Sequence, residues 1–249
     1  YSRKKKPNQN YLQVLDRIVI LVCLTGCFIR LGNFFNSEII GKPTNSPLGV
    51  VFINRVTEAI MQNGNGDNPV ERLEVKKANL PSGQDGRVPI DILLLFKKNV
   101  NEQQAHSFIG SNVKFYLSQY TEFVDEPSVN RLQYEVIKDS SGTYSAWVRT
   151  FGIERHPAQL YESISSLLLF VFLFWYWSKY KINLPEGRIF GWFMIILWSL
   201  RFAYEFLKIN QVSFEDQLPL NMGQILSIPM VLVGIVILIR SYRKPDPVQ

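Results

Sequence analysis

An arginine, two asparagines and a glutamate stand at the end of an apolar stretch, in the run Arg-Leu-Gly-Asn-Phe-Phe-Asn-Ser-Glu-Ile-Ile-Gly at residues 30–41. The preceding residues 18–29 have no charge and, beside two cysteines, only Thr25 as a polar side chain. This is typical of a membrane span that residues 30–35 complete. A charge at the centre of a lipid-facing helix costs roughly 2.5 to 3.5 kcal/mol, so Arg30 is expected to face protein, water or a charged ligand.

A second arginine, Arg201, stands in a later apolar run, with Glu205 four residues further on. Arg30 follows Ile18 by twelve residues, and Arg201 follows Ile189 by twelve. At about 1.5 Å per residue both are about 18 Å into a core of about 30 Å. Two arginines at one depth suit a phosphate, which takes bidentate guanidinium contacts. Two alternatives stay open: Arg201 and Glu205 only neutralise each other, or Arg30 snorkels to lipid head groups.

Further polar side chains are expected at the outer ends of the spans. They are Asn33, Glu205, His156, Gln159, Tyr161, Glu162, Asn221 and Gln224. Structural roles are favoured for two of them: His156 before Pro157 caps a helix or meets an interface, and Gln224 satisfies backbone groups. Gly32 and Gly41 permit close helix packing or a turn.

Three later windows have the length and composition of membrane spans, at residues 158–178, 189–207 and 222–239. Basic residues flank the four spans in three clusters: Arg3, Lys4, Lys5, Lys6 and Arg17; Lys179, Lys181 and Arg188; Arg240, Arg243 and Lys244. Four crossings place all three clusters on one side, so the positive-inside rule predicts cytoplasmic termini and an extracytoplasmic segment at 42–157. Much of the net charge of +6 is therefore topological and gives no support to nucleic-acid binding.

The segment between the first and second spans predicts a small α+β head domain. A weak helical pattern covers 46–62, strands are expected at 73–78 and 89–97, a short helix at 106–120, and a hairpin from 132–138 and 144–150. The predicted fold is a mainly α, multi-pass membrane helix bundle of four spans with this domain inserted. Its parts are 1–41, 42–157 and 158–249. The head is expected to shape the mouth of a site or to meet a protein substrate.

Cysteine and histidine usage argues against metal chemistry. Cys23 and Cys27 lie four apart in the first span and are expected to pack as small apolar residues rather than to form a disulfide. The two histidines, His106 and His156, are far apart in sequence, so we expect no metal and no other cofactor. The chain begins at Tyr1 without a signal peptide, and part of the protein is expected upstream.

Four motifs give the chain a resemblance to a known family. They are the run at 30–41, Arg155-His156-Pro157-Ala158-Gln159-Leu160-Tyr161-Glu162, Arg201-Phe202-Ala203-Tyr204-Glu205-Phe206, and Met222-Gly223-Gln224-Ile225-Leu226-Ser227-Ile228-Pro229. In this order they resemble prolipoprotein diacylglyceryl transferase, the bacterial enzyme that lipidates the lipobox cysteine. The resemblance covers nearly all of the membrane part, whereas the head domain is longer than usual and matches poorly. Family members resemble seven-span proteins, so this chain is expected to begin after the third span.

The resemblance implies a reaction and a location. Phosphatidylglycerol would donate its diacylglyceryl group to the cysteine thiol of a preprolipoprotein, forming a thioether and releasing glycerol phosphate, in the bacterial inner membrane. This is a displacement at the glycerol carbon that bears the phosphate ester. A thiolate is the nucleophile, and Arg30 and Arg201 would stabilise the departing phosphate.

The resemblance also implies site residues. The catalytic set would be Arg30, Asn33, Glu38, Arg201 and Glu205; the substrate-binding set would be Arg30, Gly41, His156, Gln159, Tyr161, Arg201 and Gln224. The family's histidine in a His-Gly-Gly-like motif, the usual candidate for the base, is absent from this sequence, as is the tyrosine of the family's first span. Two other classes therefore stay open. One is a non-catalytic anionic-lipid-binding subunit or inactive fragment, and the other is a transporter or channel, for which the four spans offer no paired broken helices or inverted repeat.

Overall fold

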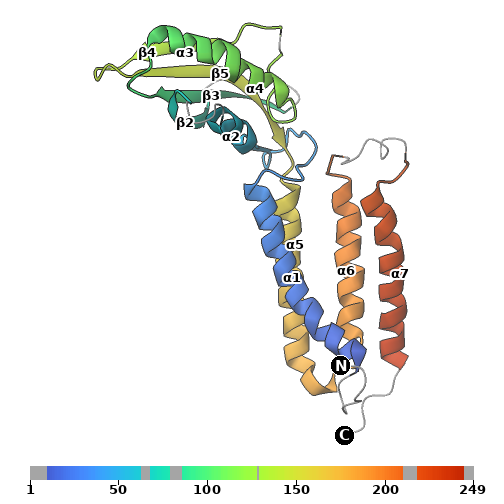
Figure 1. Cartoon of the computed structure of the whole chain (residues 1–249). Coiled ribbons are helices and arrows are strands. Elements are labelled where there is room, and N and C mark those ends of the chain that lie inside the picture. The colour runs from blue at the N-terminus through green and yellow to red at the C-terminus, as the bar shows by residue number, and fades with distance from the viewer. Residues whose placement is uncertain (1–9, 63–67, 79–85, 128, 210–217, 244–249) are drawn as a thin grey trace. The chain divides into compact units, whose positions relative to one another are not determined.

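The structure, a computed structural model, describes residues 10–62, 68–78, 86–127, 129–209 and 218–243 (Figure 1). The chain forms two compact units. One joins Tyr1–Gly41 to Pro157–Gln249, and the other is Lys42–His156. The first unit is helical and the second contains a sheet, which agrees with the predicted combination of a helix bundle and an α+β segment.

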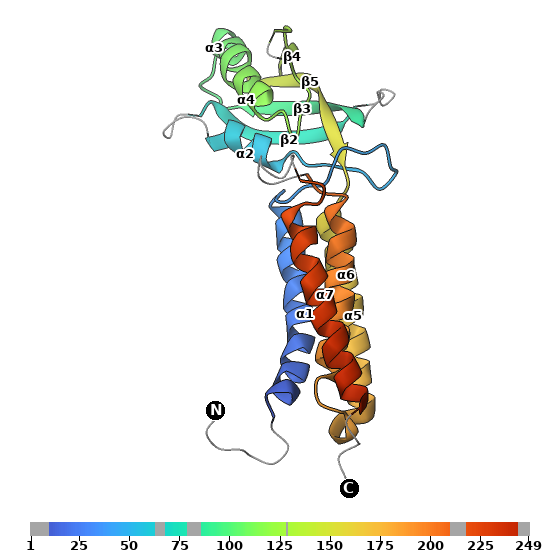
Figure 2. The same cartoon turned by 90° about the vertical axis from the view of Figure 1, so that its right-hand side faces the viewer.

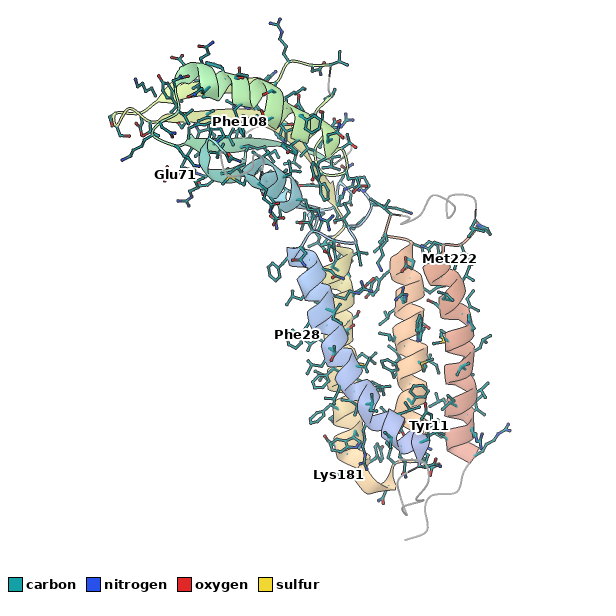
Figure 3. The ribbon with its side chains drawn as sticks, in the orientation of Figure 1. Tyr11, Phe28, Glu71, Phe108, Lys181 and Met222 are labelled. Carbon is teal, nitrogen blue, oxygen red and sulfur yellow. The ribbon has the colours of Figure 1, made fainter. Side chains whose placement is uncertain are left out.

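Among the described residues, the helical unit has four long helices: α1 (Tyr11–Phe35), α5 (Ala158–Tyr180), α6 (Arg188–Glu205) and α7 (Met222–Arg243). A 3-10 turn at Lys181–Asn183 follows α5. The helices run side by side in alternating directions (Figures 1 and 2). Figure 3 places Tyr11 and Lys181 at one end of the unit and Met222 at the other. The basic residues Lys179, Arg188 and Arg240 therefore lie toward the end that holds Tyr11, because each is at the matching end of its helix.

Three of these helices, α1, α5 and α7, are long and apolar enough to cross a membrane. The sequence predicts a fourth span at α6, but this helix has 18 residues and includes Arg188, Arg201 and Glu205. Those charges lower its apolar character. Large apolar side chains remain exposed on the three spans, among them Leu21, Phe28, Leu168, Trp175, Leu232 and Val236. Figure 3 shows Phe28 pointing away from the other helices. Such exposed apolar faces are typical of helices that meet lipid.

The core of the helical unit is formed by α1, α5 and α6. Its buried side chains are Val19, Ile20, Cys23, Leu169, Leu173, Leu184, Ile189, Phe193 and Met194. Glycines bring α6 and α7 together: a Cβ on Gly191 would lie 3.0 Å from Leu238 Cβ, and one on Gly234 would lie 2.8 Å from Met194 Cβ. Cys23 and Cys27 are both free and buried, as predicted.

Side chains from α1 also order the ends of the helices. Asn10 forms a capping box with Gln13 at the start of α1, seven residues before the predicted span begins. Asp16 is 2 % exposed and accepts hydrogen bonds of 2.7 Å from the backbone N–H groups of Gly187 and Phe190. Asp16 therefore satisfies two of the N–H groups that the start of α6 leaves without partners inside the helix.

The second unit is a five-stranded antiparallel sheet with short helices. Its elements are β1 (Val50–Val51), α2 (Asn54–Gln62), β2 (Val70–Lys77), β3 (Arg87–Phe96), α3 (Glu102–Phe108), a π-helical turn (Ile109–Val113), α4 (Lys114–Gln119), β4 (Gln133–Lys138) and β5 (Tyr144–Arg155). The strand order is β1-β5-β3-β2, and β4 also pairs with β5. Alternate residues of β3 from Val88 to Phe96 are buried, and the Phe96 ring meets Phe108 of α3 edge-on.

Most of the elements predicted for this unit are confirmed. The two strands and the hairpin occur as expected, and Asp139 accepts hydrogen bonds from the N–H groups of Ser141 and Thr143 in the hairpin loop. The Ser141 hydroxyl also donates to Asp139 at 2.6 Å, and this bond, followed by the backbone bonds, stabilises the charged form and lowers the pKa of the exposed Asp139. The predicted helix at 46–62 is wrong before Asn54. Val50 and Val51 pair with β5 instead, because β-branched side chains suit a strand.

Candidate functional site

The motif at 30–41 ends α1 and turns the chain. The Ser37 N–H donates to the Phe34 carbonyl at 3.1 Å, and the Glu38 N–H donates to the Asn33 carbonyl at 2.9 Å. With Ser37 at φ 54°, this is a Schellman cap, in which most helices have glycine at the left-handed position. Gly32 is not the turning residue: it lies within α1, and a Cβ there would meet no atom within 4 Å.

Two contacts hold the chain after α1 against the rest of the helical unit. The side chain of Gln159, which is 1 % exposed, donates from Nε2 to the Glu38 carbonyl at 2.6 Å. Gly41 is buried and forms an isolated antiparallel bridge with Lys208, just beyond the end of α6. The turn is thereby attached both to α5 and to the segment after α6.

Charged side chains from three parts of the unit form one network. Arg30 Nε lies 2.5 Å from Glu162 Oε2, which joins α1 to α5. The ammonium group of Lys208 contacts Glu162 Oε1 and lies 3.3 Å from Glu205 Oε1. The Lys208 side chain is 4 % exposed, and both carboxylates are nearly as buried. Burial of this many charges is tolerated because each has a partner of opposite sign.

Arg201 is held more loosely than Arg30. Its Nε lies 3.9 Å from Glu205 Oε1, at the outer limit of an ion pair, and the side chain is 41 % exposed. The guanidinium stacks on Trp198, 5.5 Å from the ring centroid. Among the described residues, the buried Nε atom of Arg201 has no hydrogen-bond partner. Arg201 is therefore only weakly paired with Glu205 within the part of the chain that the structure describes.

Arg30 and Arg201 line one cavity of about 190 Å³ between α1, α5 and α6. The lining residues are Val22, Cys23, Gly26, Arg30, Glu162, Ser165, Ser166, Phe193, Leu197, Trp198, Leu200, Arg201 and Tyr204. Charged and hydroxyl groups thus share the cavity with apolar side chains. Such a lining suits an amphipathic molecule with an anionic group. No three His, Cys, Asp or Glu side chains within the described ranges gather as metal ligands would.

The start of α7 fixes the position of the Glu205 carboxylate. Asn221 and Gln224 cap this helix reciprocally, with hydrogen bonds of 2.9 and 3.1 Å between side chain and backbone. Asn221 Nδ2 also donates to Glu205 Oε2 at 3.2 Å. A Cβ on Gly223 would lie 2.6 Å from Glu205 Cδ, so only glycine leaves room for the carboxylate here. Gln224 therefore satisfies backbone groups, as one of the two interpretations expects.

The structure places the predicted site residues in different parts of the chain. Arg30, Arg201 and Glu205 belong to the network around the cavity. The turn after α1 is shaped by Asn33, Glu38, Gly41 and Gln159. Gln224 caps α7. Tyr161 is half-buried in the first turn of α5. His156 belongs to the sheet unit, where its backbone N–H donates to the Lys42 carbonyl at 3.1 Å.

Arg155, the residue before His156, is also held in the sheet unit. Its Nε donates to the Glu122 carbonyl at 2.7 Å. Burial lowers the pKa of the Arg155 guanidinium, and the charge of Glu122 opposes that shift. Arg155 and the His156 backbone therefore both have structural contacts within the sheet unit.

Sequence reasoning missed Lys208 and gave Glu162 no role. Lys208 lies three residues after Glu205 and so continues the spacing of Arg201 and Glu205 along one side of the chain. The predicted span ends at residue 207, so Lys208 lies one residue beyond it. Trp198 could have been found from the same helical spacing, since it lies three residues before Arg201.

A helical unit that gathers arginines and carboxylates around one cavity, with three helices able to cross a bilayer, is typical of a membrane protein with a polar site. The sequence identifies the family. The chain belongs to the prolipoprotein diacylglyceryl transferase family, whose sequence model matches residues 1–240.

Curated relatives carry the name phosphatidylglycerol–prolipoprotein diacylglyceryl transferase. The protein of Bacteroides fragilis is 28% identical over 235 residues, covering 94% of this chain and 50% of the relative. That of Protochlamydia amoebophila is 28% identical over 241 residues, covering 97% and 40%. The Chlamydia muridarum protein is 44% identical over 97 residues, covering 38% and 35%. The chain thus spans about half the length, or less, of the Bacteroides fragilis and Protochlamydia amoebophila proteins. No solved structure matches it.

Proposed function

We propose that this protein transfers the diacylglyceryl group of phosphatidylglycerol to the lipobox cysteine of preprolipoproteins. The observation that carries the proposal is the shared cavity: Arg30 and Arg201, from helices far apart in sequence, line it together. Membership of the transferase family supports the same reaction. Phosphatidylglycerol and the signal peptide of a preprolipoprotein are the proposed substrates.

The arginines suit the charge changes of this reaction. The cysteine sulfur forms a bond to the glycerol carbon that bears the phosphate ester, and the bond from that carbon to the ester oxygen breaks. The electron pair leaves with glycerol phosphate, and the thiol proton passes to a base. Negative charge grows on the departing phosphate, so guanidinium groups beside it stabilise the transition state more than the bound lipid.

The size of the cavity limits which part of the lipid enters it. Its volume of about 190 Å³ is below the roughly 300 to 1,000 Å³ of pockets that enclose a whole drug-sized ligand. We therefore place the phosphate and the glycerol at Arg30 and Arg201. The acyl chains would start against Val22, Phe193 and Leu197 and continue into the bilayer along the helices.

The proposed location is the bacterial inner membrane, with α6 as a fourth span beside the three apolar helices. Because Lys179, Arg188 and Arg240 lie toward one end of the helical unit, the positive-inside rule supports that end as cytoplasmic. Residues 42–156 would then be extracytoplasmic, on the side where lipoprotein precursors emerge. Asn33, Glu38, Gly41 and Gln159 would keep Arg30 and its helix end in position.

The test is the transfer of labelled diacylglyceryl from phosphatidylglycerol to a lipobox peptide, run with this chain and with the complete product of its gene. The proposal expects labelled thioether and glycerol phosphate in equal amounts, and none with a peptide in which serine replaces the cysteine. Binding of the lipid without transfer by either protein would instead favour the non-catalytic lipid-binding subunit.

A further inference from the structure

Lys208 is a buried cation that the proposed reaction does not use directly. Its side chain is 4 % exposed, and its ammonium group contacts the carboxylates of Glu162 and Glu205. Its backbone is bridged to Gly41, so both ends of the residue are fixed. A buried ammonium loses its hydration, and a lysine is therefore rarely placed at such a position without a paired partner.

Lys208 competes with Arg201 for the carboxylate of Glu205. The two oxygens of Glu205 have Lys208 at 3.3 Å and Asn221 at 3.2 Å, whereas Arg201 is 3.9 Å away. Without the ammonium group, the Glu205 carboxylate would be free to form the bidentate pair that guanidinium groups prefer. Arg201 would then be occupied by protein. Lys208 thus keeps Arg201 available to a ligand in the cavity.

The network also has a defined charge. Within the part of the chain that the structure describes, the linked side chains are three cations (Arg30, Arg201 and Lys208) and two carboxylates (Glu162 and Glu205), so one positive charge is in excess among them. A phosphodiester has one negative charge and would neutralise the network. A zwitterionic head group would bring a further positive charge beside these three cations. Removal of Lys208 leaves a network with no excess charge, in which each arginine can pair with one carboxylate.

We propose that Lys208 is a positioning residue that makes the cavity selective for a lipid head group with a single net negative charge. It acts by occupying Glu162 and Glu205, so that the arginines meet the phosphodiester. This inference rests on the proposed function, because it takes the lipid donor as the ligand of the cavity. Lys208 would determine the selectivity for head-group charge, and it is not among the site residues predicted from the sequence.

The experiment measures binding separately from transfer. Short-chain phosphatidylglycerol and phosphatidylcholine are titrated onto the full chain in detergent. We expect the native protein to prefer phosphatidylglycerol. Lys208→Met should weaken phosphatidylglycerol binding by at least about tenfold and leave phosphatidylcholine binding unchanged. Lys208→Arg should keep the preference, because the positive charge remains. Lys179→Met, at the exposed end of α5, is the matched control and should change neither affinity.

A compensating variant distinguishes charge selection from a purely structural role. Lys208→Met combined with Glu162→Gln removes one charge of each sign and restores the single positive excess, so most of the preference should return. If Lys208→Met lowers the melting temperature but keeps the native preference between the two lipids, the inference is wrong. It is also wrong if the native protein shows no preference. A preference that depends on Lys208, together with an absence of transfer, supports the inference and overturns the proposed reaction.

Discussion

Arg30 on α1 and Glu162 on α5 form an ion pair, with Arg30 Nε 2.5 Å from Glu162 Oε2, beside the cavity that Arg201 also lines. The Arg30 side chain is 22 % exposed. It therefore faces a protein carboxylate rather than snorkelling to lipid head groups, which was the other interpretation of its position. The pair joins two helices whose polar residues are separated by the whole sheet unit in the sequence.

The first prediction concerns the shared phosphate. If Arg30 and Arg201 bind one phosphate, loss of either arginine removes most of the rate acceleration that the pair provides. The double variant should then be little slower than the slower single variant. The measurement is a double-mutant cycle of Arg30→Gln and Arg201→Gln on the rate of glycerol phosphate release. Fully additive losses, as for distant independent sites, would contradict the shared-phosphate arrangement.

The second prediction concerns the shape of the cation at position 201. Arg201→Lys keeps the charge but loses the planar fork, so transfer should fall by about tenfold or more. The steady-state constants for phosphatidylglycerol and the rate of transfer are the readouts. An Arg201→Lys protein with native donor affinity and rate would show that the arginine only balances Glu205.

The third prediction concerns the glycine beside Glu205. A Cβ on Gly223 would approach Glu205 Cδ to 2.6 Å, so Gly223→Ala should displace the carboxylate and reduce transfer. Gly32→Ala is the matched control, because a Cβ at Gly32 meets no atom within 4 Å. It should leave transfer unchanged and raise helix stability by up to about 1 kcal/mol. Equal effects of the two substitutions on transfer would refute the role of Gly223.

The fourth prediction concerns the capping of α6 by Asp16. Asp16→Ala leaves the N–H groups of Gly187 and Phe190 without their acceptor. We expect a loss of about 1 to 3 kcal/mol of stability, measured by thermal unfolding in detergent. Arg17→Ala, at the exposed neighbouring position, should have little effect. A stable Asp16→Ala protein would mean that other groups satisfy these donors.

The fifth prediction concerns topology. Both termini should be cytoplasmic, and residues 42–156 should be extracytoplasmic. After Cys23 and Cys27 are replaced, single cysteines are introduced at exposed sites of the sheet unit and in the turn at Lys181–Asn183. A membrane-impermeant reagent should label the first set in intact cells and the second only after permeabilisation. The reverse pattern would invert the proposed orientation.

The sequence by itself determines the elements that depend on local pattern. The apolar runs predict all four long helices, and turn residues predict the hairpin of β4 and β5, because both signals arise from neighbours along the chain. A constant rise per residue likewise predicts that Arg30 and Arg201 lie at similar depth, and both do line one cavity. The family is likewise evident from four short motifs, because each motif is a run of neighbouring residues.

Only the tertiary structure decides which partners these residues have. Lys208 is one lysine among many in the sequence, and its importance follows from the positions of Glu162 on α5 and of Gly41 after α1. Asp16 caps a helix 171 residues away, which no local pattern encodes. Gln224 has the residue type of a ligand-binding group, yet its side chain caps α7. Burial and pairing of charges depend on what packs nearby in space, and spacing along the chain does not contain that information.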